Sequence, residues 1–166
     1  MKTSQKMVKA SQITMIVMVM LLVAVFSAIF YIGSQTPSVG PNLIAEDVVV
    51  RLGSNKSAAI FLNLRNDGHQ LECVVGVEVY GEGKEGRASL SAELHNTVME
   101  GGVMKMFKVD RVCVPHMSVL KMRGSEGGGY HIMVFGDVEK FTLFHVYLKT
   151  ESGYTVRFLA SAPRGS

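Results

Sequence analysis

The chain begins with one long apolar run. From Ile13 to Ile32 the sequence has 20 positions without a charge. At about 1.5 Å of rise per residue, a helix of this length spans the roughly 30 Å hydrocarbon layer of a membrane. Three lysines precede the run and no charged residue follows it before Glu46, which favours a cytoplasmic N-terminus. The pattern predicts a membrane anchor over residues 1–33, with a cleaved signal peptide as the alternative.

A short stretch without charge follows the apolar run. Residues 34–41 read SQTPSVGP and contain two prolines, as is typical of a linker. We therefore expect the folded domain to occupy residues 42–160, followed by a tail over residues 161–166. In this arrangement the domain is exported from the cytoplasm.

Past residue 42 the hydrophobic positions alternate in short runs, separated by turns rich in Gly, Asn and Asp. In residues 89–95, for example, Leu and Ala take every second position, and Ser, Glu and His take the positions between them. No run of a dozen residues shows a helical stripe. This pattern predicts an all-β antiparallel sandwich or barrel. The expected strands are residues 58–65, 71–80, 89–95, 109–114, 130–135, 141–149 and 154–159.

The charge balance excludes one class of function. Of the 17 Lys and Arg residues, three precede the apolar run, so 14 remain to face 14 Asp and Glu. A neutral domain without a basic stripe cannot gather phosphate contacts, which argues against nucleic-acid binding. The sequence also lacks a nucleophile paired with a base and a phosphate-binding glycine loop, so we expect no enzyme.

The two cysteines, Cys73 and Cys113, lie far apart in the sequence. Their spacing fits neither a zinc ribbon nor a CxxC redox motif. They fit two small buried apolar side chains, and in an oxidising compartment they could instead form a disulfide. The sequence leaves both alternatives open.

Methionine and histidine gather in two short segments. The chain has 11 methionines, of which six lie in the domain. Four of those six fall in residues 95–106 (HNTVMEGGVMKM) or in His131-Ile132-Met133. Core methionines ordinarily scatter as fillers of irregular gaps. Their crowding beside histidines therefore indicates a metal site.

Strand geometry places the candidate ligands on shared faces. Residues two apart in a strand point to the same side, so His131 and Met133 project together. His95 lies on the polar side of its alternating strand, shortly before the turn at Glu100-Gly101-Gly102, and Met106 follows that turn. Two segments, each with an imidazole and a thioether, can then converge on one ion. The candidate metal site comprises His95, Met106, His131 and Met133.

The softness of these donors decides which ion they suit. Thioether sulfur is neutral and polarisable and selects Cu(I), and imidazole also suits copper. Zinc favours thiolates or more histidines and carboxylates, and calcium favours clustered carboxylates, whereas Glu100 is the only carboxylate in the two segments. A blue-copper site needs a cysteine thiolate beside two histidines, and this set contains no cysteine, which argues against an electron-transfer cupredoxin. Because the four ligands carry no negative charge, we expect a site that releases its Cu(I).

These residues resemble the motif of the periplasmic copper chaperones called PCu(A)C, formerly a domain of unknown function. That motif is a His, ten residues, a Met, a spacer of about twenty residues and then His-x-Met. Here ten residues separate His95 from Met106, 24 residues separate Met106 from His131, and Met133 completes the last pair. The longer spacer is expected to lengthen a loop at residues 124–127.

The resemblance covers about residues 45–160. It implies a cupredoxin-like Greek-key β-sandwich in which His95, Met106, His131 and Met133 hold Cu(I). Met99 and Met104 match other methionines of the family's first segment and are expected beside this set or as alternates to its members.

The resemblance also implies a role. The role is delivery of Cu(I) to the dinuclear copper centre of cytochrome c oxidase subunit II, together with a Sco-type thiol protein. The predicted anchor, in which the chain departs from the family, places the protein in the bacterial inner membrane with a periplasmic domain; a cleaved signal peptide would leave it soluble in the periplasm. An envelope copper buffer is an alternative with the same chemistry. A metal-free scaffold or adhesion sandwich is an alternative of another class.

Overall fold

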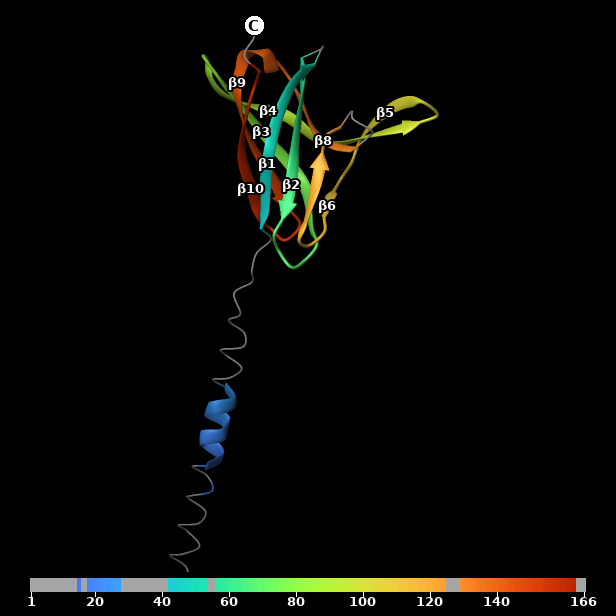
Figure 1. Ribbon diagram of the computed structural model, residues 1–166. Helices are drawn as coiled ribbons and strands as arrows, with labels where there is room; N and C mark the ends of the chain where they lie inside the picture. Colours follow the sequence, from blue (N-terminus) through green and yellow to red (C-terminus); the bar gives the residue numbers. More distant parts are fainter. Residues whose placement is uncertain (1–14, 16–17, 28–41, 54–55, 125–128, 164–166) are drawn as a thin grey trace, which may run out of the picture. The chain divides into compact units, whose positions relative to one another are not determined.

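The computed structural model describes residues 15, 18–27, 42–53, 56–124 and 129–163. The chain divides into two units, residues 1–38 and residues 39–166. In the first unit, residues 18–27 are helical and exposed. In the second unit, the described residues form ten strands and one turn of 3₁₀ helix (Figure 1).

The predicted membrane-spanning helix is not supported. In the described part of the chain, no helix has both the length and the apolar character needed to cross a membrane. The helix that is described, residues 18–27, lies within the apolar run of the sequence. Most of the remaining run and the predicted linker lie outside the described residues.

The strands of the second unit follow one another along the chain with short connections. They are β1 (Leu43–Gly53), β2 (Ser57–Asn66), β3 (Glu72–Gly83), β4 (Gly86–Glu100), β5 (Val103–Lys108), β6 (Val112–Val114), β7 (Ser118–Met122), β8 (Gly129–Phe135), β9 (Phe141–Thr150) and β10 (Thr155–Ser161), with the 3₁₀ turn η1 (Val138–Lys140) before β9. All seven predicted strands are present, and β4 extends well beyond its predicted range.

The sequence pattern did not predict three strands, β1, β5 and β7, for different reasons. In β1 a bulge between Glu46 and Val49 interrupts the alternation of polar and apolar residues. In β5 all six side chains are exposed, so neither face carries a buried pattern. The third, β7, is only five residues long.

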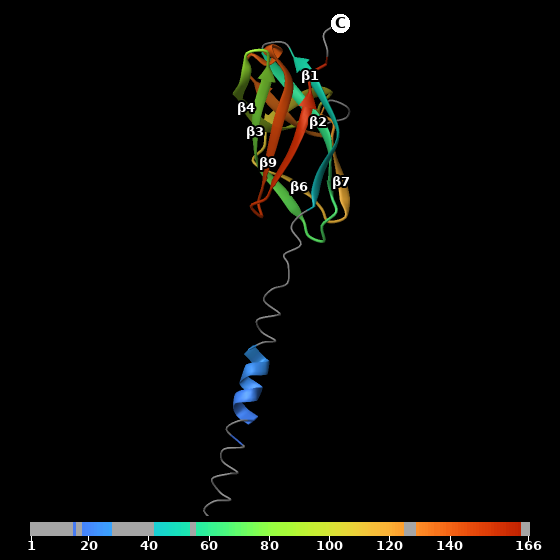
Figure 2. The same cartoon turned by 90° about the vertical axis from the view of Figure 1, so that its left-hand side faces the viewer.

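All strand pairings in the described residues are antiparallel, which confirms the predicted all-β class. The strand order is β1-β2-β8-β4-β3-β9-β10, with β5 added to β4, β6 to β3 and β7 to β2. Figures 1 and 2 show these strands curling around a common core, so that the sandwich is nearly barrel-shaped.

The long strand β4 joins the two layers. Its first part, residues 86–90, pairs with β3, and residues 91–97 pair with β8. Its last part, residues 95–100, pairs with β5 in a hairpin that extends away from the rest of the sandwich (Figure 1). This change of partner brings the two segments that contain the candidate ligands into contact.

The core lies between the layers and consists of alternate residues of the central strands. β2, β4 and β8 contribute one side, and β3 and β9 contribute the other. The fully buried members include Ile60, Leu62, Ile132, Val134, Val79, Phe144, Val146 and Leu148. Because each strand alternates, the opposite face of the layer formed by β2, β8 and β4 is free for other chemistry.

Cys73 and Cys113 form a disulfide, which decides between the two alternatives left open above. They lie directly opposite each other in the adjacent strands β3 and β6. Disulfides persist in oxidising compartments such as the bacterial periplasm. The bond therefore agrees with an extracytoplasmic domain.

Candidate metal centre

The two candidate histidines lie side by side. His95 of β4 is directly opposite His131 of β8, and their ring centroids are 5.9 Å apart. Met133 lies two residues along β8 from His131 and therefore shares its face. The other face of β8 carries Ile132 and Val134, which are buried in the core. His131 and Met133 therefore project from the outer face of this layer.

Met106 reaches the same face from the opposite side. Residues 95–97 of β4 pair with both β8 and β5, so these two strands flank β4 on opposite edges. Met106 is opposite Thr97, which is two residues from His95. Diagonal positions of this kind lie about 7–8 Å apart, within reach of long side chains. All four candidate ligands thus belong to one face of one sheet.

The four candidate side chains differ sharply in burial. His131 is only 1% exposed, and the side chain of His95 is 13% exposed. Met133 is partly buried, whereas Met106 is 52% exposed. The imidazoles therefore form the floor of the site, and Met106 lies at its open edge.

Aromatic rings pack beside both histidines. The centroid of the Phe61 ring lies 5.8 Å from that of His131, and the centroid of the Phe135 ring lies 6.2 Å from that of His95. Gly124 packs over Phe61 with a φ of +62°, and a Cβ there would lie 2.3 Å from the ring. Only glycine allows both this conformation and this close approach. Gly124 thus packs against the aromatic ring that lies beside His131.

Each histidine has one ring nitrogen engaged and one free. Nε2 of His95 lies 3.0 Å from a carboxylate oxygen of Glu93, and Nδ1 of His131 lies 3.3 Å from the carbonyl oxygen of Gly129. These oxygens only accept, so each engaged nitrogen carries the hydrogen. Among the described residues, neither Nδ1 of His95 nor Nε2 of His131 has a hydrogen-bond partner, although both are buried. Two nitrogen lone pairs are therefore available to a metal.

Glu93, which the sequence analysis did not single out, contacts the candidate metal centre. Its carboxylate accepts hydrogen bonds from His95 and, at 3.0 Å, from Nζ of Lys108. The hydrogen bond from His95, followed by that from Lys108, lowers the pKa of Glu93 and keeps it ionised. Histidines that bind metals commonly donate their second N–H to a carboxylate in this way. Its position two residues before His95, on the same face of an alternating strand, was the available signal.

The buried histidine is held in its neutral form. Burial lowers the pKa of His131 below its ordinary value of 6.5, and the neighbouring His95 acts in the same direction. The hydrogen bond to the Gly129 carbonyl opposes this shift but is weaker. Because imidazole binds a metal only when it is neutral, the ring of His131 is available as a ligand at neutral pH.

The donor set fits a soft monovalent ion better than a hard divalent one. The described residues contain no group of three or more His, Cys, Asp or Glu placed to hold a metal ion. The thioethers of Met106 and Met133 lie on the same face and are available as further donors. Neutral imidazole and thioether together suit Cu(I).

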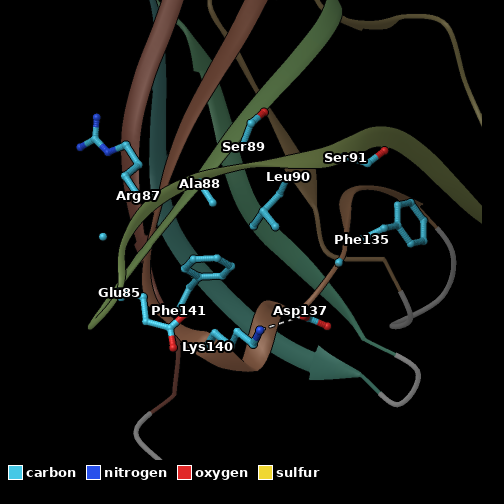
Figure 3. A pocket seen from close by; sticks show the side chains of 13 residues that line it. Glu85, Arg87, Ala88, Ser89, Leu90, Ser91, Phe135, Asp137, Lys140 and Phe141 are labelled. Carbon is cyan, nitrogen blue, oxygen red and sulfur yellow. Dashed lines mark ion pairs between the residues drawn. The ribbon is translucent and has the colours of Figure 1, made fainter.

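A separate pocket lies beside the first part of β4. It has a volume of about 420 Å³ and lies between β4 and the connection from β8 to β9. Figure 3 shows Arg87, Ser89 and Phe141 around it, with Lys140 in an ion pair to Asp137. None of the four candidate ligands lines this pocket, so we do not assign the metal chemistry to it.

The fold and the site define a small antiparallel β-sandwich with a paired-histidine site flanked by thioethers. Among solved structures, the apo PCuAC domain from PmoF1 is 17% identical, with a TM-score of 0.52 over 74% of this chain and 94% of that one. The apo PCuAC domain from PmoF2 is 16% identical, with a TM-score of 0.50 over 74% and 92%. The copper-bound PCuAC domain from PmoF2 is 17% identical, with a TM-score of 0.49 over 73% and 93%.

The family model described as "Putative lipoprotein LpqE-like" matches residues 43–158, and the chain belongs to this family. This match and the shared fold confirm the resemblance to PCu(A)C domains. No curated protein matches the chain significantly.

Proposed function

We propose that this protein binds Cu(I) as cargo and hands it to another copper protein. The observation that carries the proposal is the pair of adjacent histidines, each with a buried nitrogen that has no partner among the described residues. A buried imidazole nitrogen without a hydrogen bond costs free energy, about 1–3 kcal/mol for a typical polar group. A bound ion would remove this cost. The role proposed is binding and transfer, without enzymatic activity.

The uncharged donor set supports transfer rather than permanent storage. Two imidazoles and two thioethers leave the full +1 charge of Cu(I) uncompensated. A thiol-containing acceptor offers charged thiolate ligands, which soft copper prefers. Cu(I) can therefore leave this site for such an acceptor by exchanging one ligand at a time.

The acceptor that we propose is the dinuclear copper centre of cytochrome c oxidase subunit II, reached directly or through a Sco-type protein. Storage of copper in the envelope is the competing function. Deleting the gene and measuring oxidase activity at low copper distinguishes the two. Delivery predicts a loss of oxidase activity that added copper restores, whereas storage predicts greater copper sensitivity with normal oxidase activity.

We propose that the apolar run over residues 13–32 attaches the protein to the inner membrane. The family description mentions a lipoprotein, but both cysteines of this chain are joined in the disulfide and offer no thiol for a lipid. Washing isolated membranes with high salt and then with detergent tests the attachment. The protein should resist salt and be released by detergent.

The direct test of the metal site is X-ray absorption on the Cu(I)-loaded protein. The expected result is copper surrounded by two nitrogen and two sulfur neighbours. A variant with all four candidate ligands replaced by leucine serves as the control in an anaerobic Cu(I) titration. If the wild type binds no more Cu(I) than this variant, the metal-free scaffold replaces the proposal.

A further inference from the structure

The tip of the β4–β5 hairpin brings two more methionines together. Met99 of β4 is directly opposite Met104 of β5. The hairpin closes through Gly101 and Gly102, whose φ angles of +61° and +81° suit a two-residue type I′ turn. Glu100 and Val103 flank that turn and form its hydrogen-bonded pair. The next pair, Met99 and Met104, is therefore of the non-hydrogen-bonded kind, in which side chains approach most closely.

This pair continues the face of the metal centre. Along β4, positions 99, 97 and 95 share one side of the strand, and the last of them is His95. Along β5, Met104 and Met106 share that same side, because they are opposite positions 99 and 97. From the tip inward, the face therefore presents the Met99–Met104 pair, then Met106, and then the two histidines.

Exposure is similar at the three methionines and much lower at the histidines. Met99 and Met104 are 54% and 50% exposed, and Met106 is 52% exposed. Beyond them, His131 is buried and His95 is partly buried. At the tip, the charged pair of Lys105 and Glu100 lies on the other face, whereas Lys108 pairs with Glu93 beside the histidines. The uncharged thioethers of the three methionines thus form a line from the exposed tip of the hairpin to the ring nitrogens of the two histidines.

Packing does not account for these methionines. All six side chains of β5 are exposed, and neither member of the tip pair belongs to the core. Three large apolar side chains on one face, each about half exposed, leave apolar surface in contact with water, which is unfavourable. A function that uses their sulfur atoms explains the arrangement.

We propose that Met99 and Met104 form a second, outer Cu(I) site through which the ion enters and leaves the inner site. This inference rests on the proposed function of the inner site. Transfer between the sites is a ligand exchange: a bond from Cu(I) to Met106 forms as a bond to Met99 or Met104 breaks. No electron moves, and the ion keeps its +1 charge throughout.

The test uses the full chain in detergent, with methionine methyl groups labelled with ¹³C. Ag(I), a diamagnetic ion with the charge and softness of Cu(I), is the probe in the NMR titration. The first equivalent should shift the methyl signals of Met106 and Met133. The second should shift those of Met99 and Met104. A titration that leaves the Met99 and Met104 signals unmoved overturns the outer site.

The functional test is the rate at which a chromophoric chelator removes Cu(I) from the loaded protein. The double variant Met99→Leu and Met104→Leu keeps the volume and apolar character of the tip but removes its sulfur. It should bind one equivalent with wild-type affinity and release it about tenfold more slowly, a difference of about 1.4 kcal/mol in the barrier. Met117→Leu, at an exposed methionine outside the hairpin, is the matched control and should behave as wild type.

The outcomes separate this inference from the proposed function. If the double variant releases Cu(I) at the wild-type rate, the tip pair is only an apolar contact surface and the outer site is wrong, while the inner site stands. If the wild-type protein binds neither Cu(I) nor Ag(I), the proposed function itself fails. In the variant His95→Leu with His131→Leu, the Met99 and Met104 methyl signals should still shift with Ag(I).

Discussion

The two halves of the candidate centre are built differently. β8 contributes His131 and Met133 from a strand that is paired on both edges, with β2 and with β4. β5 contributes Met106 from a six-residue strand that pairs with β4 and has no buried side chain. One half of the centre is part of the core layer, and the other half is part of an exposed hairpin.

This difference separates two tasks of a transfer protein. Buried, hydrogen-bonded donors need little ordering when an ion binds, so they supply affinity. Strands with few buried contacts open most easily, so the hairpin half suits exchange with solvent or with a partner. We expect substitutions in the β8 half to weaken binding most.

The largest effect is expected for His131→Leu. Loss of a buried donor should weaken Cu(I) binding by at least about 100-fold, because partners outside the ligand set already cost roughly 10–100-fold. In the apo protein, the variant removes a buried nitrogen without a partner, which should raise the free energy of unfolding by about 1 kcal/mol, less the contribution of the long hydrogen bond to the Gly129 carbonyl that is also lost. A chelator competition and a urea titration measure the two effects.

The control for this variant is His116→Leu, at an exposed histidine outside the site. It should leave both quantities unchanged. A protein with His131→Leu that binds Cu(I) as tightly as wild type would show that the buried histidine is only a packing residue.

A smaller effect should distinguish the two thioethers. Met133→Leu should weaken Cu(I) binding more than Met106→Leu. The exposed Met106 must lose side-chain freedom on binding, at a cost of up to about 1.5–2 kcal/mol, whereas the partly buried Met133 is already restricted. Parallel competition titrations of the two variants give the order, and the reverse order would contradict the assignment of affinity to the β8 half.

Glu93→Gln should reduce affinity by about tenfold. Glutamine preserves the size of the side chain but removes the negative charge that holds the N–H of His95 in place. Glu100→Gln is the matched control, because Glu100 pairs with Lys105 on the other face of the hairpin. Equal affinities of the two variants would remove Glu93 from the site.

The smallest effect is on the pH dependence of the apo protein. The pKa of His131 is below 6.5 in the folded state, so the unfolded chain binds the proton first as the pH falls. Stability from this residue is complete above pH 6.5 and is lost below it, by at most about 1.4 kcal/mol per pH unit, until the folded pKa is reached. Urea titrations between pH 7 and pH 5 should show this loss in wild type but not in His131→Leu.

Much of the fold around the site could be predicted from local sequence patterns. Alternation in residues 89–95 and 130–135 predicted the two strands that carry the histidines, and it predicted which side of each is apolar. The i and i+2 spacing of His131 and Met133 was enough to place them on one face. The neighbour of His95 was harder to predict, because pairing between distant strands leaves no local trace.

Strand β5 and Glu93, the carboxylate partner of His95, show most clearly what could not be predicted from the sequence. Val103–Lys108 has no buried face, so its alternation carries no hydrophobic signal. Glu93 looks like an ordinary solvent-facing residue in an alternating strand. Its role depends on the ring orientation of His95 and on Lys108, which arrives from β5.

The amino-acid sequence alone determined the all-β class, the apolar N-terminal run, the His/Met chemistry and its soft character. These properties depend on residue type and on spacing within single segments. Only the tertiary structure decided that His95 and His131 are neighbours, that one ring nitrogen of each has no partner among the described residues, and that Cys73 is bonded to Cys113. Each of these depends on the register between strands distant in the chain, which long-range packing of the core sets.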